Sequence, residues 1–461
     1  MQLRFGLLIA TALFPSWVRV AFLQCSFMRL WRLWAAETGA AGLRKCFPGE
    51  DEASRRLRSY MIGLWLDTGA PPSRGSFFMQ TAVLGGWQKL GEAYPVGGPQ
   101  KTALAMVEAI EAKGGAVFVR CPVSKILLDE TTGAACGVVL SNGDEIRARR
   151  VVSAAGYRAT ESLLKDSTLH SSRAAATATA YSPPARPLLT GQSAGFVMAN
   201  IGLNGTREAL GIGDATLWLQ PADETNGYDA LAGADAFFAD PLGVPIEQIP
   251  AGITFPSVKG RNAWLGAKDG GDSVHHSCQI LVPAEWRWFE DHLPTERCQA
   301  AIDEVGSRHA PPHLERHGQG EYDEIKAQWS ARLLQLLHRH YPKTVGRVEF
   351  LDISTPLTIE HYLGSYKGAG VGLDVTPQRF VHPQELAELA CKHPRVPGLW
   401  RAGQDYLMCG QVMAAASGII TALRMRGALD TLRFGVRALR LLVFALNWPA
   451  DEDDSDEKKD V

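Results

Sequence analysis

Residues 399–418 read LWRAGQDYLMCGQVMAAASG, and this stretch determines the fold that the sequence predicts. The apolar run at 399–402 indicates a strand, which ends in a glycine turn and a carboxylate at Gly403-Gln404-Asp405. Small residues at 414–418 then indicate a closely packed helix that begins near Gln411. A strand that leads through a turn to a helix N-terminus favours binding of a polar or anionic ligand.

A second group of predicted elements lies between residues 100 and 156. Helical spacing of apolar residues predicts a helix at 100–113, which Gly114-Gly115 ends. Strands are predicted at 116–119, 123–128, 136–140 and 145–147, with a tight turn at Asn142-Gly143 before the last of them. The apolar pair at 151–152 enters small residues at 153–156, where a backbone or a ligand can approach closely.

The two ends of the chain carry apolar and charged patterns. The apolar stretch at 5–18 is shorter than the ~20 residues of a spanning helix. Apolar residues continue past Arg19, which favours a buried or membrane-facing helical layer over a signal peptide. At 427–448, arginines occupy one helical face and apolar residues another, so this segment either lies in a membrane interface or docks on its own domain. The acidic residues of 449–461 predict a disordered tail, whose last four residues, KKDV, resemble an endoplasmic reticulum retrieval signal.

Composition and charge exclude several classes of protein. The 461 residues are 46% hydrophobic and carry a formal net charge of −2, which gives no electrostatic basis for nucleic-acid binding. The eight cysteines form no Cys-x-x-Cys pair, so we expect reduced thiols that are mostly packed. Two prolines separate His309, His313 and His317, so these histidines predict a polar loop and no metal site. The 46 glycines include neither a Gly-x-Gly-x-x-Gly fingerprint nor a Gly-x-x-x-x-Gly-Lys-Ser/Thr loop.

Several motifs, in their order and spacing, resemble the flavin-dependent carotenoid desaturase and isomerase superfamily, and within it the retinol saturase branch. The matching stretches are YPVGG at 94–98, VVSAAG at 151–156, FPS at 255–257, VPAEWRWF at 282–289, TPLT at 355–358 with Tyr362-Leu363, and Gly403-Gln404-Asp405 with Cys409-Gly410. Ala154 stands where the family usually has asparagine. Family members open with a β-α-β unit that carries the glycine fingerprint, and we expect this chain to begin after that unit.

The resemblance implies a mixed α/β fold of the two-domain, glutathione-reductase-like type. Its FAD domain would be discontinuous, with an incomplete Rossmann sheet, and would pack beside a substrate domain. The expected segments are a helical, apolar part of the substrate or membrane-facing domain at 1–90, FAD-domain segments at 91–165 and 346–426, a substrate domain at 166–345, the amphipathic helix at 427–448 and the tail at 449–461.

The resemblance also assigns residues to an FAD site. Val123 would lie at the adenine, Ala155 and Gly156 at the diphosphate, and Asp405 at the ribityl chain and flavin edge, although Asp405 could instead cap a helix. The other expected cofactor residues are Gly97, Gly98, Gly403, Gln404, Gly410, Gln411 and Val412. Tyr94 and Tyr362 are candidate proton donors near the flavin ring.

The function implied is an FAD-dependent oxidoreductase that acts on a C=C bond of a retinoid or carotenoid, by reduction, desaturation or isomerisation. Five aromatic residues could line a tunnel for the polyene or pack in the core: Trp31, Trp34, Trp65, Phe77 and Phe78. Peripheral membrane contact is expected, at the endoplasmic reticulum with a plastid as the alternative location, and neither nucleic acid nor metal is expected as a partner.

Two other functions stay open. The missing fingerprint favours a truncated, non-catalytic relative or an incomplete gene sequence that cannot hold FAD alone. The string Gly191-Gln192-Ser193-Ala194-Gly195 also fits the Gly-x-Ser-x-Gly motif of serine hydrolases. That motif requires a strand before the serine and a helix after it, whereas prolines precede it here and glycines follow it.

Overall fold

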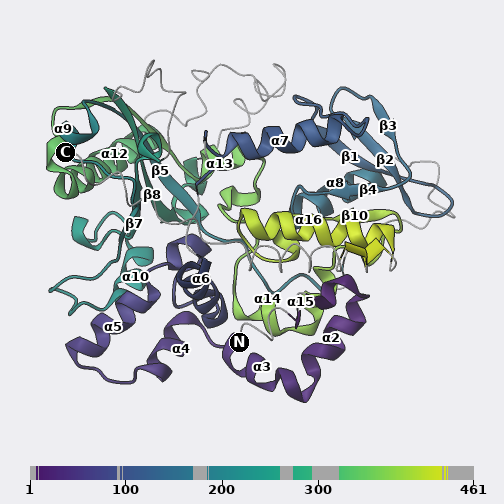
Figure 1. Cartoon of the computed structure of the whole chain (residues 1–461), viewed down its shortest axis with the longest axis horizontal. Coiled ribbons are helices and arrows are strands. Elements are labelled where there is room, and N and C mark those ends of the chain that lie inside the picture. The colour runs from purple at the N-terminus through teal and green to yellow at the C-terminus, as the bar shows by residue number, and fades with distance from the viewer. Residues whose placement is uncertain are drawn as a thin grey trace, which may run out of the picture.

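The computed structural model describes residues 7–8, 10–90, 94–95, 97–169, 184, 186–259, 274–292, 321–427, 430–431 and 433–434, and every structural statement concerns these parts of the chain. Figure 1 shows helices mixed with strands, which lie in two separate groups. This arrangement confirms the mixed α/β class, and the two groups of strands agree with the expected two-domain fold.

A five-stranded antiparallel sheet forms the larger group, in the order β6-β7-β8-β5-β9. Its strands are β5 (Gly195–Asn204), β6 (Leu217–Leu219), β7 (Ala251–Thr254), β8 (His275–Ala284) and β9 (Val348–Ser354). Along β5, buried residues alternate with half-buried ones, because successive side chains of a strand point to opposite faces. One face of the sheet therefore packs on a core, and the other can line a cavity.

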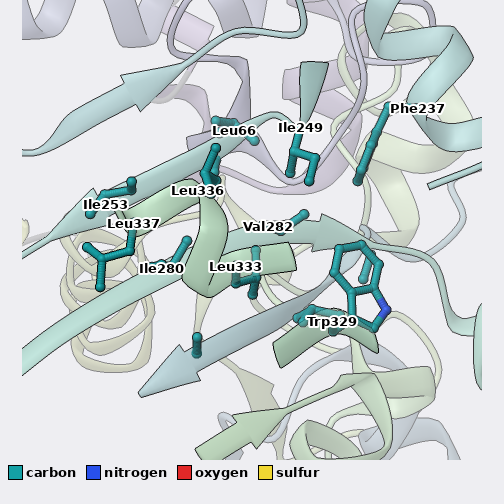
Figure 2. Packing of buried hydrophobic residues seen from close by; sticks show 14 of the residues in the cluster. Leu66, Phe237, Ile249, Ile253, Ile280, Val282, Trp329, Leu333, Leu336 and Leu337 are labelled. Carbon is teal, nitrogen blue, oxygen red and sulfur yellow. The ribbon is translucent and has the colours of Figure 1, made fainter. Parts of the chain in front are cut away.

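Helix α12 (Glu321–His340) covers the core face of this sheet. Its apolar residues recur every three or four positions, so they share one side of the helix. The side chains that meet at this interface are Trp329, Leu333, Leu336 and Leu337 from α12 and Ile253, Ile280 and Val282 from the sheet (Figure 2). The apolar spacing of 321–341 alone also predicts one continuous helix, which the structure confirms, and the apolar face accounts for the position of the helix.

The smaller group of strands contains the stretch at 399–402. Strand β10 (Leu399–Arg401) pairs in parallel with β4 (Val151–Ser153), and β1 (Val123–Leu128), β2 (Ala135–Leu140) and β3 (Glu145–Arg147) form an antiparallel sheet beside them. These strands confirm the predictions from 123 to 156. The parallel pair is also the arrangement expected at the centre of a dinucleotide-binding fold.

The strand predicted at 116–119 was wrong, because these residues adopt no regular structure. Phe118 and Val119 are 71% and 79% exposed, so the apolar run buries little surface. Arg120, which follows, has a φ of 57°, a left-handed conformation that interrupts an extended backbone. An apolar run forms a strand only where a neighbouring strand can pair with it, and no described strand lies against this one.

The N-terminal helices pack into two different cores. They are α2 (Ser16–Gln24), α3 (Arg29–Ala35), α4 (Gly39–Cys46), α5 (Glu52–Ile62) and α6 (Phe77–Leu90). Trp65, after α5, joins the core of the five-stranded sheet, whereas Trp31 and Phe78 pack with Phe380. These three N-terminal aromatic residues are at most 2% exposed, so the tunnel role considered for them was wrong and core packing explains them.

The remaining helices lie around the two groups of strands. They are α7 (Gln100–Glu111), α8 (Tyr157–Leu169), α9 (Arg207–Leu210), α10 (Ala230–Ala239), α13 (Pro356–Leu363), α14 (Pro377–Val381), α15 (Pro383–Glu388) and α16 (Gln411–Arg426). None of the described helices is long and apolar enough to cross a membrane. The histidines at 309–317, most of 427–448 and the tail at 449–461 lie outside the described residues.

Candidate functional site

A small polar hollow lies where the parallel strands β4 and β10 end. Each strand runs into a glycine turn, at Gly156 before α8 and at Gly403 after β10, so both turns meet at the carboxyl edge of the pair. The hollow has a volume of about 100 Å³. Its lining residues are Ala154, Ala155, Gly156, Arg158, Ala159, Gln192, Ser365, Tyr366, Gly372, Gln404 and Asp405.

Asp405 joins three segments of the chain at this hollow. Its Oδ2 accepts a hydrogen bond from the amide of Tyr157 at 2.7 Å, and its Oδ1 accepts one from the amide of Leu373 at 2.8 Å. The side chain is 4% exposed, so both bonds are protected from water. A Cβ on Gly372 would lie 2.1 Å from Oδ1, and one on Gly156 would lie 3.0 Å from Oδ2. Glycine at both positions therefore allows the carboxylate to approach the backbone.

Arg379 also binds the backbone segments that Asp405 joins. Its guanidinium donates hydrogen bonds to the carbonyl oxygens of Leu373 at 2.7 Å and Gln404 at 2.7 Å, which flank the two sides of the hollow. Burial lowers the pKa of Arg379, and the negative charge of Asp405 opposes that shift. Asp405 and Arg379 thus hold the same segments together, one through amide groups and the other through carbonyl groups.

The hollow also presents polar groups that have no partner in the described parts of the chain. Arg158 Nε and Gln192 Oε1 are buried without a hydrogen bond. The Arg158 guanidinium lies 5.8 Å from the ring centroid of Tyr366, and the first turn of α8 leaves amide groups that its own helix cannot satisfy. A cation together with a helix N-terminus fits an anionic or hydroxyl-rich group, such as part of FAD, although 100 Å³ is too small for the whole molecule.

Arg158 is a candidate site residue that was missed in the sequence. The signal was its place in the first turn of the helix after the VVSAAG stretch, where the helix dipole disfavours a positive side chain. A cation at such a position is stabilised by a nearby negative group, which here would be a ligand.

A buried group of charged side chains, none of which lines the hollow, also holds α8. His393 Nε2 lies 3.1 Å from Glu161 Oε1 on α8, and Arg395 binds both carboxylate oxygens of Glu388 at 2.6 and 2.7 Å. Burial lowers the pKa of His393, although its hydrogen bond with Glu161 opposes the shift. The imidazole is therefore held in its neutral form, and its contact with Glu161 serves the structure rather than the hollow.

A much larger cavity, of about 1210 Å³, lies over the second face of the five-stranded sheet. The half-buried residues Phe196 and Asn200 of β5 and Gln279 and Leu281 of β8 form part of its floor. The YPVGG loop and the start of α7 form part of the opposite wall, through Tyr94, Gly97, Gly98, Pro99, Gln100, Lys101 and Leu104. The cavity is large enough for an elongated ligand of drug size.

One backbone segment separates the two spaces. Val371 lines the large cavity, and the next residue, Gly372, lines the hollow. Ser193 holds this segment, because its amide donates to Gly372 O at 3.0 Å and its Oγ accepts from the amide of Val371 at 3.1 Å. A group bound in the hollow and a ligand in the cavity would therefore lie on opposite sides of a single stretch of chain.

The structure brings some of the expected site residues together and leaves others apart. Ala155, Gly156, Gln404 and Asp405 line the hollow, and Gly403 leads into it. Tyr94, Gly97 and Gly98 line the large cavity instead. The other five expected site residues lie at neither space. Val123 lies on β1, and Tyr362 is 58% exposed on α13. Gly410, Gln411 and Val412 form the exposed start of α16.

The serine hydrolase alternative has no support in the structure. The residues after Ser193 continue directly into β5, whereas a nucleophile elbow requires a helix there. The Ser193 hydroxyl accepts a backbone hydrogen bond, so it holds the segment at 371–372 and does not project into a cleft.

Comparisons with known proteins agree with the motifs. Residues 29–187 match the family described as flavin containing amine oxidoreductase. The all-trans-retinol 13,14-reductases of Danio rerio and Macaca fascicularis are 27% and 28% identical to this chain, with 80% of the chain and 54% of each relative covered. A protein of Danio rerio named inactive all-trans-retinol 13,14-reductase is 26% identical, over 77% of the chain and 52% of the relative. The resemblance to the retinol saturase branch is thus confirmed, and the chain spans about half the length of the curated relatives it matches.

Two solved structures resemble the chain more distantly. Putrescine oxidase bound to putrescine has a TM-score of 0.46 and 15% identity, over 88% of this chain and 70% of the other. An oxidoreductase from Methanosarcina mazei has a TM-score of 0.45 and 14% identity, over 84% of this chain and 68% of the other.

Proposed function

We propose that this chain carries the flavin and substrate sites of an FAD-dependent oxidoreductase that acts on a C=C bond of an apolar polyene, and specifically of a retinoid. The observation that supports it most strongly is the position of the segment at 371–372 between a polar hollow and a large cavity. Hydride exchange requires direct contact between cofactor and substrate, so a cofactor held in part by the hollow would have to extend past this segment into the cavity. The similarity to proteins named all-trans-retinol 13,14-reductase supports a retinoid.

The residues of the hollow would hold part of FAD. Arg158 and the amide groups of α8 that follow Tyr157 fit its negative or hydroxyl-bearing portion, and Gln192 Oε1 would accept one hydrogen bond. When bound, a flavin supplies the hydride chemistry that protein side chains lack. Asp405 acts here as a positioning residue, because both of its oxygens already bind backbone amides.

The residues of the cavity would bind and orient the polyene. The cavity walls are mainly apolar and exclude water from a conjugated chain placed over the sheet. Tyr94 lines this cavity, so its phenolic Oη is the candidate to deliver a proton to substrate carbon. Tyr362 lies on the exposed side of α13 and is a weaker candidate for that step.

A second candidate function is retinoid binding without chemistry. It is favoured by one observation, which is that the 461 residues contain no glycine fingerprint for the FAD diphosphate. The hollow alone would then have to provide the binding energy for the cofactor, through Arg158 and the N-terminus of α8.

Flavin content separates the two candidates. The chain is purified, its visible absorbance is recorded, and flavin released by acid is quantified for the wild type, Arg158→Ala and the exposed control Arg149→Ala. The oxidoreductase predicts bound FAD in the wild type and the control, and a substantial loss in Arg158→Ala. A folded wild-type chain that binds no flavin, even with FAD added in excess, would contradict the oxidoreductase and favour simple binding.

A further inference from the structure

A row of polar side chains crosses the floor of the large cavity. The strand register places Thr254 of β7 opposite Gln279 of β8, and Gln279 opposite Asn200 of β5. Thr216, just before β6, continues the row, because its Oγ1 lies 3.2 Å from Thr254 Oγ1. Gln279 Nε2 donates to Asn200 Oδ1 at 3.0 Å. Directly opposed residues of neighbouring strands share one face, so all four side chains lie on the cavity side.

Lys259 ends this row at the edge of the sheet. Its Nζ donates to Thr216 Oγ1 at 2.7 Å, and no carboxylate of the described residues lies within 4.0 Å of it. Because Thr216 accepts from Lys259, its own proton is free to point to Thr254 Oγ1. The Thr254 proton and the other two protons of the ammonium group then remain as donors toward the cavity. This end of the row offers donors and a positive charge, so it fits an oxygen that accepts hydrogen bonds.

The floor on either side of the row is flat and apolar. The Trp218 ring lies over Gly252, where an added Cβ would be 3.2 Å from its Cζ3 atom. Phe350 lies in the same way beside Gly202, where an added Cβ would be 3.1 Å from the Cβ atom of Phe350. The two glycines leave room for the aromatic side chains to cover the strands. At about 4.8 Å between neighbouring strands, the floor from β6 to β9 extends ~19 Å, which suits a long apolar chain.

From this geometry we infer that Lys259 and Thr254 hold the oxygen-bearing end of an elongated apolar ligand, while its hydrocarbon chain lies across the floor of the cavity. The inference deepens the proposed function, on which the retinoid character of the ligand rests. A hydroxyl and a carboxylate share the chemistry that this site recognises. The positive charge of Lys259 favours the carboxylate more strongly than the hydroxyl, and this difference can be measured.

Ligand binding to the full chain tests the inference without any turnover. All-trans-retinol, all-trans-retinoic acid and a retinoid hydrocarbon without oxygen are titrated while tryptophan fluorescence is recorded, because Trp218 lines the cavity. The variants are Lys259→Met, Lys259→Arg and Thr254→Val, with the exposed Lys113→Met as the matched control. Far-ultraviolet circular dichroism verifies that each variant is folded.

We expect Lys259→Met to raise the Kd of the oxygenated ligands about tenfold or more and to leave the Kd of the hydrocarbon unchanged. Lys259→Arg should restore most of the affinity, Thr254→Val should weaken both oxygenated ligands, and Lys113→Met should change nothing. A larger loss for retinoic acid identifies a carboxylate as the preferred group, and equal losses identify a hydroxyl. Equal losses for all three ligands, or no loss for any of them, would overturn the inference.

The flavin content of the same samples separates this inference from the proposed function. A flavin-free chain that still prefers oxygenated retinoids through Lys259 retains the inference and removes the oxidoreductase. A flavin-loaded chain whose ligand affinities do not depend on Lys259 retains the oxidoreductase and removes the inference. If no retinoid binds to a folded chain at all, the inference is overturned.

Discussion

Replacing Asp405 by asparagine tests whether this carboxylate holds the hollow together in the absence of a cofactor. The substitution keeps the size of the side chain and exchanges one oxygen for an NH₂ group. Because the amides of Tyr157 and Leu373 each donate to a different oxygen, one of them must then face a second donor. The conflict cannot be relieved by rotating the side chain, since the amide group of asparagine has only one oxygen.

The expected cost follows from the loss of one hydrogen bond to a charged acceptor. Such bonds contribute about 1.5–3 kcal/mol to stability, and the buried amide that loses its acceptor cannot be satisfied by water. We therefore expect Asp405→Asn to lower the free energy of unfolding by about 1.5–3 kcal/mol. Asp405→Ala removes both bonds and should cost roughly twice as much.

Two measurements on the flavin-free chain check this prediction. Urea unfolding gives the free-energy change, and hydrogen exchange measured by mass spectrometry reports the amides of Tyr157 and Leu373, one of which should exchange faster. The exposed Asp214→Asn is the matched control and should stay within about 0.5 kcal/mol of the wild type. If Asp405→Asn also stays within that range, with unchanged exchange at both amides, the carboxylate does not join these segments. A loss seen only in flavin-loaded protein would assign it to the cofactor instead.

Two further predictions concern a glycine and a histidine. Gly372 and Gly346 both have left-handed backbones, with φ of 73° and 72°, so replacing either by alanine should cost ~1–2 kcal/mol in strain. Only Gly372→Ala also places a Cβ against Asp405, so urea unfolding should show a further loss of ~1–3 kcal/mol for that variant. Equal losses of stability for the two variants would refute the contact. For His393, the lowered pKa means that the unfolded chain binds the proton more readily, so stability is full above the unfolded pKa of about 6.5 and falls as the pH drops below it. Replacing His393 by Asn should flatten this part of the pH profile of unfolding, and an unchanged slope would show that another group causes it.

The parts of the fold that could be predicted are those specified by local patterns. The hairpin at Asn142-Gly143 and the helix at 321–340 each depend on a turn or a repeat that neighbouring residues define. The strand at 399–401 was also visible, because an apolar run leads into a glycine turn. The apolar run at 116–119 had the same local pattern but found no neighbouring strand, and a single segment of sequence does not show whether a partner exists.

The candidate site was predicted in part, for the same reason. The turns at Gly156 and Asp405 could be recognised from their motifs, and the parallel pairing of their strands brings them together. The polar row from Lys259 to Asn200 could not be recognised, because it joins residues of four separate sequence segments through strand register. Register between distant strands depends on how the whole sheet assembles, which no local pattern records.

The bond between Tyr157 and Asp405 has a consequence for how the chain matures. It joins residues 248 positions apart, so the first turn of α8 lacks this partner until those further residues have been made. At the usual speed of translation, that interval is on the order of ten to fifty seconds. The amide of Tyr157 binds water during this time, and the strands at 151–153 and 399–401 cannot yet pair. The hollow is therefore completed only after residue 405 has been made, and a ligand enters it once the two strands can pair rather than nucleating the folding of the first strand alone.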